Sequence, residues 1–222
     1  MQPNNLSNYA FIFDLDGTLV NSFPQILKCL KKTSAELSML PIDSELTWLL
    51  FGQPLIEIVS ANGVPSNQIS KYVDRFRENL RSEIENNNEL FDGVTDLISK
   101  IHKLDLKLGI ATSKPTDLAK LVCQNSDLSL YPFAIQGSED IPPKPNPTVI
   151  KKVLAKLGVS SGIMIGDRTE DIKAGKAAGL NTCAILQSAH QRKDFELIMP
   201  DFIFDSIEDL NCNLQDILEL VD

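Results

Sequence analysis

The sequence predicts an α/β fold: a doubly wound, Rossmann-like parallel sheet with a helical cap domain inserted after the first strand. Three observations lead to this prediction. Short apolar runs typical of buried strands recur along the chain. Stretches with helical spacing separate most of these runs, as expected for βαβ units. One long early segment has helical candidates but no convincing strand.

Six short apolar runs are predicted as strands. They lie at residues 10–13, 107–111, 134–136, 162–165, 182–186 and 202–204. Between them, the stretches TDLAKLVCQN, PTVIKKVLAKLG and TEDIKAGKAAG have helical spacing, and the last two end at Gly158 and Gly179. Glycine is the usual residue just past the end of a helix. This alternation predicts parallel strands joined by right-handed crossovers.

Residues 22–90 break the alternation. In ISKYVDRFRENLRSEI the apolar residues recur at intervals of three and four, which forms one helical stripe: Ile69, Val73, Phe76, Leu80 and Ile84. The polar run ENNNE that follows is typical of a linker. We therefore predict a helical cap domain at residues 22–90, inserted into a core domain of residues 1–21 and 91–222.

Composition limits the partners. The chain has 222 residues, of which 43% are hydrophobic, and its net charge is −9. The electric field of a negatively charged protein repels nucleic acid and anionic membranes. The four cysteines form no CxxC pair and the two histidines lie far apart, which disfavours disulfides and a zinc site. The stretch MQPNNLSN lacks signal-peptide features, and no apolar run could span a bilayer. We expect a cytoplasmic monomer or homodimer without nucleic-acid or membrane partners.

Polar side chains follow several predicted strands. In open parallel sheets, ligands bind beyond the carboxyl ends of the strands, where loops converge. Four separate parts of the chain supply candidates there: Asp14 and Asp16, Thr112 and Ser113, Lys144, and Asp167. If the strands are neighbours, three carboxylates, a hydroxyl and an ammonium meet at one point.

Three carboxylates in a small site repel one another unless a cation is present. Asp14, Asp16 and Asp167 offer hard oxygen ligands, which suit Mg²⁺. A metal would also let a phosphate approach an acidic protein. Thr112 and backbone N–H groups can donate to phosphate oxygens, and Lys144 supplies a fixed positive charge.

A carboxylate at this position can attack phosphorus, because aspartate is an established nucleophile toward phosphoryl groups. The second aspartate, two residues on, can protonate the leaving oxygen and later deprotonate water. Gly17 permits the sharp turn that keeps both groups near the phosphate.

Each of these residues also has a purely structural interpretation. Asp14 and Asp16 can form an Asx turn at the end of a strand. Asp167 can be a helix N-cap, and Asp171 can be a favourable charge in the first helical turn. Ser113 either donates to the phosphate or only turns the chain.

Four stretches in order, DLDGT, ATSK, the lysine of PPKPNP and GDRTED, resemble the motifs of the haloacid dehalogenase superfamily of phosphatases. The predicted helical insertion resembles the cap domain of that superfamily. Within it, GIATSKP, FDGV and GDRTEDIKAGKAAG are similar to phosphoglycolate phosphatase-like enzymes. The resemblance covers nearly the whole chain and is weakest in the cap.

The resemblance implies a role for each residue. Asp14 is then the nucleophile and Asp16 the general acid and base. Thr112 and Lys144 bind phosphate, and Lys144 also steadies Asp14. Mg²⁺ is held by Asp14, the backbone carbonyl of Asp16, and Asp167, with Asp171 an acceptor outside this ligand set.

These observations predict a Mg²⁺-dependent phosphatase that hydrolyses a small phosphorylated metabolite, phosphoglycolate-like, through an aspartyl-phosphate. Two alternatives stay open. A sugar-phosphate mutase or phosphotransferase would use the same core residues and pass the phosphoryl group to a second hydroxyl. A non-catalytic binding module on the same fold would be expected to lack one of those residues.

The cap offers few signals about the substrate. Arg75, Arg77 and Arg81 lie off the apolar stripe. They either reach a substrate carboxylate or form a solvated helix face.

Overall fold

A computed structural model describes residues 8–86, 88–187 and 190–219 of the chain. Its sheet contains six strands: β1 (Tyr9–Phe13), β2 (Lys107–Ala111), β3 (Ala134–Gln136), β4 (Ser161–Gly166), β5 (Asn181–Ile185) and β6 (Phe202–Phe204). The order is β3-β2-β1-β4-β5-β6, and every pairing is parallel. The predicted doubly wound α/β fold is confirmed, and each predicted strand matches to within one residue at either end.

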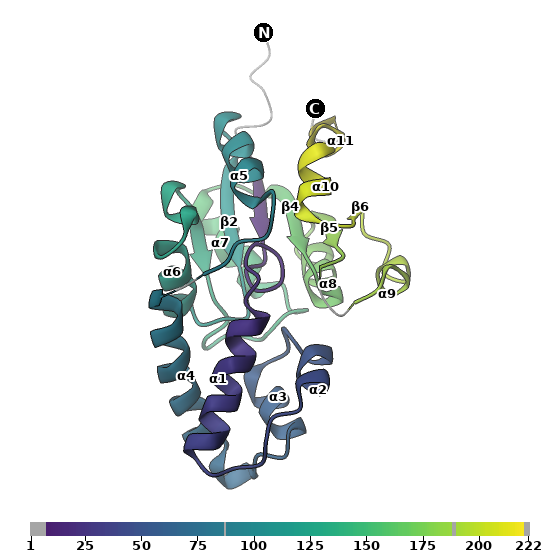
Figure 1. Cartoon of the computed structure of the whole chain (residues 1–222). Coiled ribbons are helices and arrows are strands. Elements are labelled where there is room, and N and C mark those ends of the chain that lie inside the picture. Colours follow the sequence, from purple (N-terminus) through teal and green to yellow (C-terminus); the bar gives the residue numbers. More distant parts are fainter. Residues whose placement is uncertain (1–7, 87, 188–189, 220–222) are drawn as a thin grey trace.

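Helices cover both faces of the sheet (Figure 1). One face carries α7 (Thr148–Leu157) and α8 (Thr169–Ala177), and the other carries α5 (Val94–Lys103), α6 (Thr116–Gln124) and α10 (Ile207–Cys212). The outer elements are η3 (Asp127–Leu130), α9 (Arg192–Glu196) and α11 (Leu214–Glu219). A strand covered on both faces must be apolar throughout, which explains why β1 is buried along its whole length.

Successive side chains of β1 enter different cores. Phe11 and Phe13 pack into the larger cluster with α5 and α6, whereas Ala10 and Ile12 pack with α7. This alternation follows from the two-residue period of a strand. The prediction of a helix end at Gly158 is also confirmed, because this residue caps α7 with a φ of 70°.

Residues between β1 and α5 form helices at the carboxyl ends of the strands (Figure 1). They are α1 (Phe23–Glu36), α2 (Ser44–Leu49), α3 (Leu55–Ala61), η2 (Ser66–Gln68) and α4 (Ile69–Asn86). In α4 four residues of the predicted stripe are buried, and Ile69 at its start is half-buried; the four are Val73, Phe76, Leu80 and Ile84. We refer to residues 22–90 as the cap segment; the domain boundaries at its two ends remain a prediction.

The chain enters and leaves the cap segment side by side. Val20 forms an antiparallel bridge with Leu90. The N–H of Asn21 donates to the carbonyl of Glu89 at 2.9 Å, and the N–H of Phe91 donates to that of Leu19 at 3.1 Å. These bonds fix the base of the cap segment close to the loop that follows β1.

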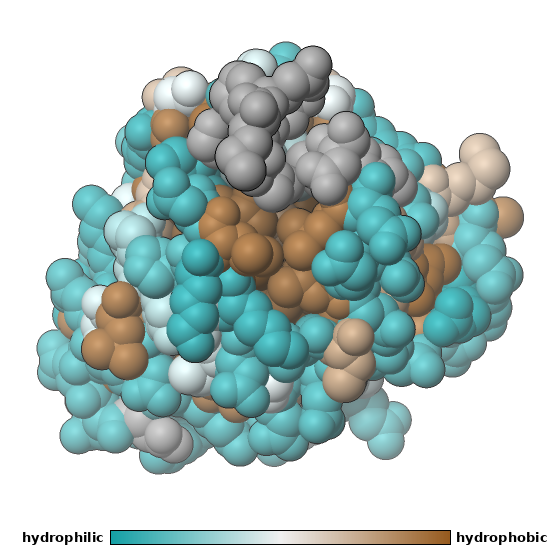
Figure 2. Space-filling model, turned by 90° about the horizontal axis from the view of Figure 1, so that it is seen from above, coloured by the Kyte–Doolittle hydropathy of each residue, from teal (hydrophilic) through white to brown (hydrophobic). Residues whose placement is uncertain are grey.

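The opposite end of the molecule, at the amino ends of the strands, is mainly hydrophilic, with a group of apolar residues near its centre (Figure 2). Among the described residues, each helix is too short or too polar to cross a membrane.

Candidate active site

Two of the predicted aspartates follow the two central strands. Asp14 comes directly after β1, and Asp167 comes directly after β4, which pairs with β1. The backbone N–H of Asp14 donates to the carbonyl of Ile165 at 2.9 Å. The strand order reverses direction between β1 and β4, and such a switch point opens a crevice at the carboxyl ends of the strands. The topology therefore brings both carboxylates to the usual ligand site of this fold.

The carboxylates of Asp14, Asp167 and Asp171 form a buried cluster, with one oxygen of each within 4.8 Å of the others. We call these three residues the aspartate cluster. Lys144 Nζ lies 3.0 Å from Asp14 Oδ1 and also pairs with Asp171. The same ammonium donates to the carbonyl of Ala111 at 3.1 Å, so it ties the end of β2 to the cluster.

Burial and neighbouring charges shift the pKa values of Asp14 and Lys144. Desolvation raises the pKa of the Asp14 carboxyl to about 6, although Lys144 opposes the shift. For Lys144, burial lowers the pKa of the ammonium, but the charges of Asp14 and Asp171 outweigh it and the net shift is upward. Lys144 is therefore charged at all physiological pH values.

The donor set of the aspartate cluster fits a hard divalent cation. Three buried carboxylates face one lysine, so the cluster carries an excess of negative charge that a metal ion would offset. Oxygen donors alone suit Mg²⁺. Asp171 already uses both oxygens, one on Lys144 and the other, at 3.1 Å, on the backbone N–H of Arg168. That leaves Asp14 and Asp167 as the better side-chain donors.

The contact between Asp171 and Arg168 also bears on the structural interpretation of Asp171. Its carboxylate accepts from the N-cap residue of α8, so it does stabilise the first turn of that helix. The same side chain holds Lys144. Both interpretations of Asp171 therefore apply at once.

The loop after β1 is built around Gly17. Its φ is 85°, and a Cβ there would lie 2.5 Å from Asp167 Oδ2. The next residue, Thr18, is buried and its hydroxyl donates to Asp167 Oδ1 at 2.7 Å. Gly17 thus permits both the left-handed turn and the close approach of Asp167.

Asp16 lies near the aspartate cluster but has a different partner. Lys114 Nζ lies 2.8 Å from Asp16 Oδ1, and both side chains are largely buried. Lys114 belongs to the loop after β2, and its backbone N–H donates to the Thr112 hydroxyl at 3.2 Å. In the same loop the carbonyl of Ser113 accepts from the Ser138 hydroxyl at 2.6 Å.

A cavity of about 360 Å³ lies between these loops and the cap segment. Its core side includes six of the residues named above: Asp14, Asp16, Thr112, Ser113, Lys114 and Ser138. Its cap side comes from α1, the loop before α3, α3 and α4, and is largely apolar. Cavities of this size and mixed character bind small ligands.

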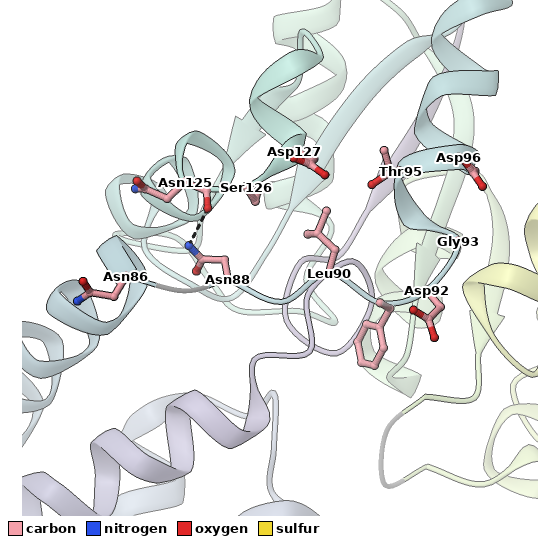
Figure 3. Close-up of a pocket in the computed structure, with 11 residues that line it drawn as sticks. Asn86, Asn88, Leu90, Asp92, Gly93, Thr95, Asp96, Asn125, Ser126 and Asp127 are labelled. Carbon is pink, nitrogen blue, oxygen red and sulfur yellow. Dashed lines mark hydrogen bonds between the residues drawn. The ribbon is translucent and has the colours of Figure 1, made fainter.

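A larger cavity, of about 530 Å³, lies where the chain leaves the cap segment. Its lining is mainly polar and comes from the chain between the end of α4 and the first turn of α5 and from the loop after α6; Asn88 donates there to the carbonyl of Asn125 at 3.3 Å (Figure 3). This cavity includes no residue of the aspartate cluster. We therefore assign the chemistry to the smaller cavity.

A family model of haloacid dehalogenase-like hydrolases matches residues 11–185. The chain belongs to this family. The resemblance seen in the sequence is therefore confirmed. Because the family consists of hydrolases, this chain is an enzyme.

Two named groups of relatives resemble this hydrolase over most of their length. Pyrophosphatase PpaX of Oceanobacillus iheyensis is 26% identical, over 92% of this chain and 96% of its own. A Clostridium perfringens protein, provisionally named pyrophosphatase PpaX, is 32% identical over 91% of this chain and 98% of its own. Phosphoglycolate phosphatase of Salmonella paratyphi A is 27% identical, over 93% of each protein.

Solved structures agree with the fold. A haloacid dehalogenase-like family protein of Streptococcus pneumoniae superposes with a TM-score of 0.81 at 25% identity, over 97% of this chain and 99% of its own. A haloacid dehalogenase-like hydrolase of Bacteroides fragilis reaches the same TM-score at 21% identity, over 91% and 99%. At this lower identity, the similarity to the Bacteroides fragilis structure shows a shared fold and nothing more.

The structure brings the predicted site residues of this hydrolase into two adjoining groups. Lys144 joins the aspartate cluster, whereas Asp16, Thr112 and Ser113 line the cavity beside it. The sequence interpretation missed Lys114 and Thr18. Both stand inside quoted motifs, ATSK and DLDGT, and their spacing from Thr112 and Asp16 was the available signal.

Proposed function

We propose that this hydrolase is a Mg²⁺-dependent phosphatase that cleaves a small phosphomonoester through an aspartyl-phosphate on Asp14. One observation carries the proposal. The Asp14 carboxylate borders the cavity, while Lys144 lies 3.0 Å from it and Asp167 and Asp171 lie beside it. A nucleophile, a fixed cation and metal-type donors thus meet at one wall of a ligand-sized cavity.

In the first step, an Asp14 oxygen attacks phosphorus and the bond from phosphorus to the leaving oxygen breaks. Asp16, which lines the same cavity, gives its proton to the leaving oxygen. Asp16 then takes a proton from a water molecule as that water attacks the phosphorus of the aspartyl-phosphate. Inorganic phosphate leaves, and the Asp14 carboxylate and the Asp16 proton are restored.

The other residues position and neutralise charge. Lys144 and Thr112 would bind phosphate oxygens, and Ser113 would present a further donor at the cavity wall. Asp14, Asp167 and the main-chain carbonyl of Asp16 would hold Mg²⁺, which when bound supplies positive charge to the phosphoryl oxygens. Asp171 would keep Lys144 in place from outside this ligand set. The apolar cap wall would exclude bulk water during the reaction.

The proposed substrate is phosphoglycolate or a similarly small phosphate compound. Relatives named phosphoglycolate phosphatase support the first choice, and relatives named pyrophosphatase support inorganic pyrophosphate as the second. Transfer of the phosphoryl group to a second hydroxyl would use the same residues, and it is an outcome of the test below.

The test is release of inorganic phosphate from a small aryl phosphate, with and without Mg²⁺, by the wild type and Asp14→Asn. Asp216→Asn is the matched control, because Asp216 is exposed on α11. The proposal expects Mg²⁺-dependent turnover in the wild type and the control, and none in Asp14→Asn. Equal turnover in all three proteins would contradict it. Faster turnover with an added sugar-phosphate acceptor would identify a transferase.

A further inference from the structure

The cap side of the active-site cavity carries a single charged residue among the described residues that line it. That residue is Arg77 of α4. Its neighbours on the cavity wall, Val73, Phe76 and Leu80, are apolar and buried. Arg77 itself is exposed to solvent, so its guanidinium stands at the rim of this apolar wall, where a ligand entering the cavity can reach it.

The three arginines of α4 differ in their partners. Arg75 pairs with Glu36 at 2.7 Å and with Glu78 at 2.8 Å. Arg81 pairs with Asp117 of α6. Within the described part of the chain, no carboxylate lies within ion-pair distance of Arg77. Two arginines of α4 therefore serve the structure, and the third has its charge available to a ligand.

The cavity's other charged residues are already engaged. Lys114, its cation on the core side, pairs with Asp16 at 2.8 Å. Glu139 accepts from the backbone N–H of Thr116 at 2.8 Å. Lys144 does not line this cavity and pairs with Asp14 and Asp171 of the aspartate cluster. An anion on the leaving group of a substrate would thus find Arg77 as its cationic partner on the cap side.

We propose that Arg77 binds a second anionic group on the leaving group of the substrate, and so selects substrates that are charged at both ends. This inference rests on the proposed phosphatase function. A carboxylate and a phosphate offer the same oxygen pair to a guanidinium, which can donate to it with two N–H groups. The second group is therefore an oxyanion, either a planar carboxylate or a tetrahedral phosphate. The experiment below distinguishes these two groups.

The experiment compares three substrates in the presence of Mg²⁺. Phosphoglycolate carries a carboxylate, pyrophosphate carries a second phosphate, and 2-hydroxyethyl phosphate matches phosphoglycolate in size with no second charge. The enzymes are the wild type, Arg77→Met, which keeps the length of the side chain, and Arg77→Lys. Arg75→Met and Arg81→Met are the matched controls, because they remove a paired arginine from the same helix.

We expect Arg77→Met to lower kcat/KM for the preferred charged substrate by about 10- to 100-fold, the usual effect of losing a hydrogen bond to a charged group. The value for 2-hydroxyethyl phosphate should change less than about threefold. Arg77→Lys should recover part of the loss, and the two control variants should leave the ratio of charged to uncharged substrate unchanged. Whichever of phosphoglycolate and pyrophosphate shows the loss identifies the second group.

Two results would overturn the inference while leaving the phosphatase function intact. One is a wild type that hydrolyses 2-hydroxyethyl phosphate as well as both charged compounds. The other is an Arg77→Met enzyme whose kcat/KM falls equally for all three substrates, which would mean a structural role for Arg77. Failure of the phosphatase proposal would instead appear as activity that survives Asp14→Asn.

Discussion

Lys114 Nζ lies 2.8 Å from Asp16 Oδ1, and this ion pair joins the loop after β2 to the loop after β1. Both side chains are largely buried, so the pair is shielded from solvent. Asp16, the carboxylate proposed to transfer protons, is therefore held in place by Lys114, a residue of a different motif. Catalysis should therefore depend on Lys114 even though Lys114 exchanges no proton with the substrate.

We predict that Lys114→Met lowers kcat about 10-fold or more for an alkyl phosphate and clearly less for an aryl phosphate. An alkoxide leaves poorly and needs the Asp16 proton, whereas a phenolate leaves with little help. Lys114→Arg should retain part of the activity. The measurement is kcat for both substrates in the wild type, Asp16→Asn, Lys114→Met and the double variant. A loss of equal size with both leaving groups would argue against a positioning role.

Gly17 offers a second prediction, because a matched glycine exists elsewhere in the fold. Gly17 has a φ of 85° and would place a Cβ 2.5 Å from Asp167 Oδ2; Gly179 has a φ of 79° with nothing within 4 Å of a Cβ. Alanine at either position should cost about 1–2 kcal/mol of stability from the left-handed backbone. Only Gly17→Ala should also displace Asp167 and lose most of the activity.

Urea unfolding and phosphate release test the two alanine variants together. The expected result is that Gly17→Ala is at least as destabilised as Gly179→Ala and loses far more of its kcat. If Gly179→Ala loses as much activity as Gly17→Ala, then general destabilisation explains both, and the close approach of Gly17 to Asp167 has no special importance.

The sequence pattern predicted most of the scaffold because the physical signals were local. β1 is apolar in every position because helices cover both faces of the sheet, and Gly158 marks the end of α7 because that position is left-handed. Lys144 was found as the lysine of the PPKPNP stretch, whereas Asp14 and Asp167 were found because polar residues at strand ends are conspicuous. Their convergence follows from the strand order, in which β1 and β4 are neighbours.

Side-chain partners could not be predicted in the same way. In the sequence alone, Lys114 and Thr18 cannot be told from ordinary loop residues. Their contacts with Asp16 and Asp167 depend on how loops far apart in sequence meet. The same holds for α4, where nothing in the sequence distinguishes Arg77 from Arg75 and Arg81. Only the positions of Glu36, Glu78 and Asp117 in space separate the three.

A third prediction concerns the contact between the cap segment and the core. Gly52 has a φ of 86°, and a Cβ there would overlap the side chain of the buried Arg168, which follows Asp167. Gly63, also in the cap segment, has a φ of 82° and would meet only Leu40 Cδ1 at 3.5 Å. We expect Gly52→Ala to raise KM several-fold by moving the cavity wall away from the site. Gly63→Ala should leave KM unchanged, and a KM increase of the same size in both variants would contradict this.

Metal binding should be visible without any catalysis. If Asp14 and Asp167 hold Mg²⁺, the ion stabilises the folded state by about 2.7 kcal/mol at 100 times its dissociation constant. For a chain of this size that corresponds to a rise in Tm of about 5–10 °C. The rise should disappear in Asp167→Asn and persist in Asp216→Asn, as measured by thermal unfolding with Mg²⁺ or with EDTA. A rise of equal size in both variants would place the ion elsewhere.

The last prediction follows from the burial of Asp14 in the metal-free protein. Burial raises the pKa of this carboxyl to about 6 from 3.8, so the native state binds a proton more tightly than the unfolded state. Stability from this group is therefore present at low pH and is lost as pH rises from about 4 to about 6. In EDTA at pH 7.5, Asp14→Asn should be more stable than the wild type by at most about 3 kcal/mol. The advantage should vanish near pH 4, whereas a constant difference across this range would show that the Asp14 charge does not cause it.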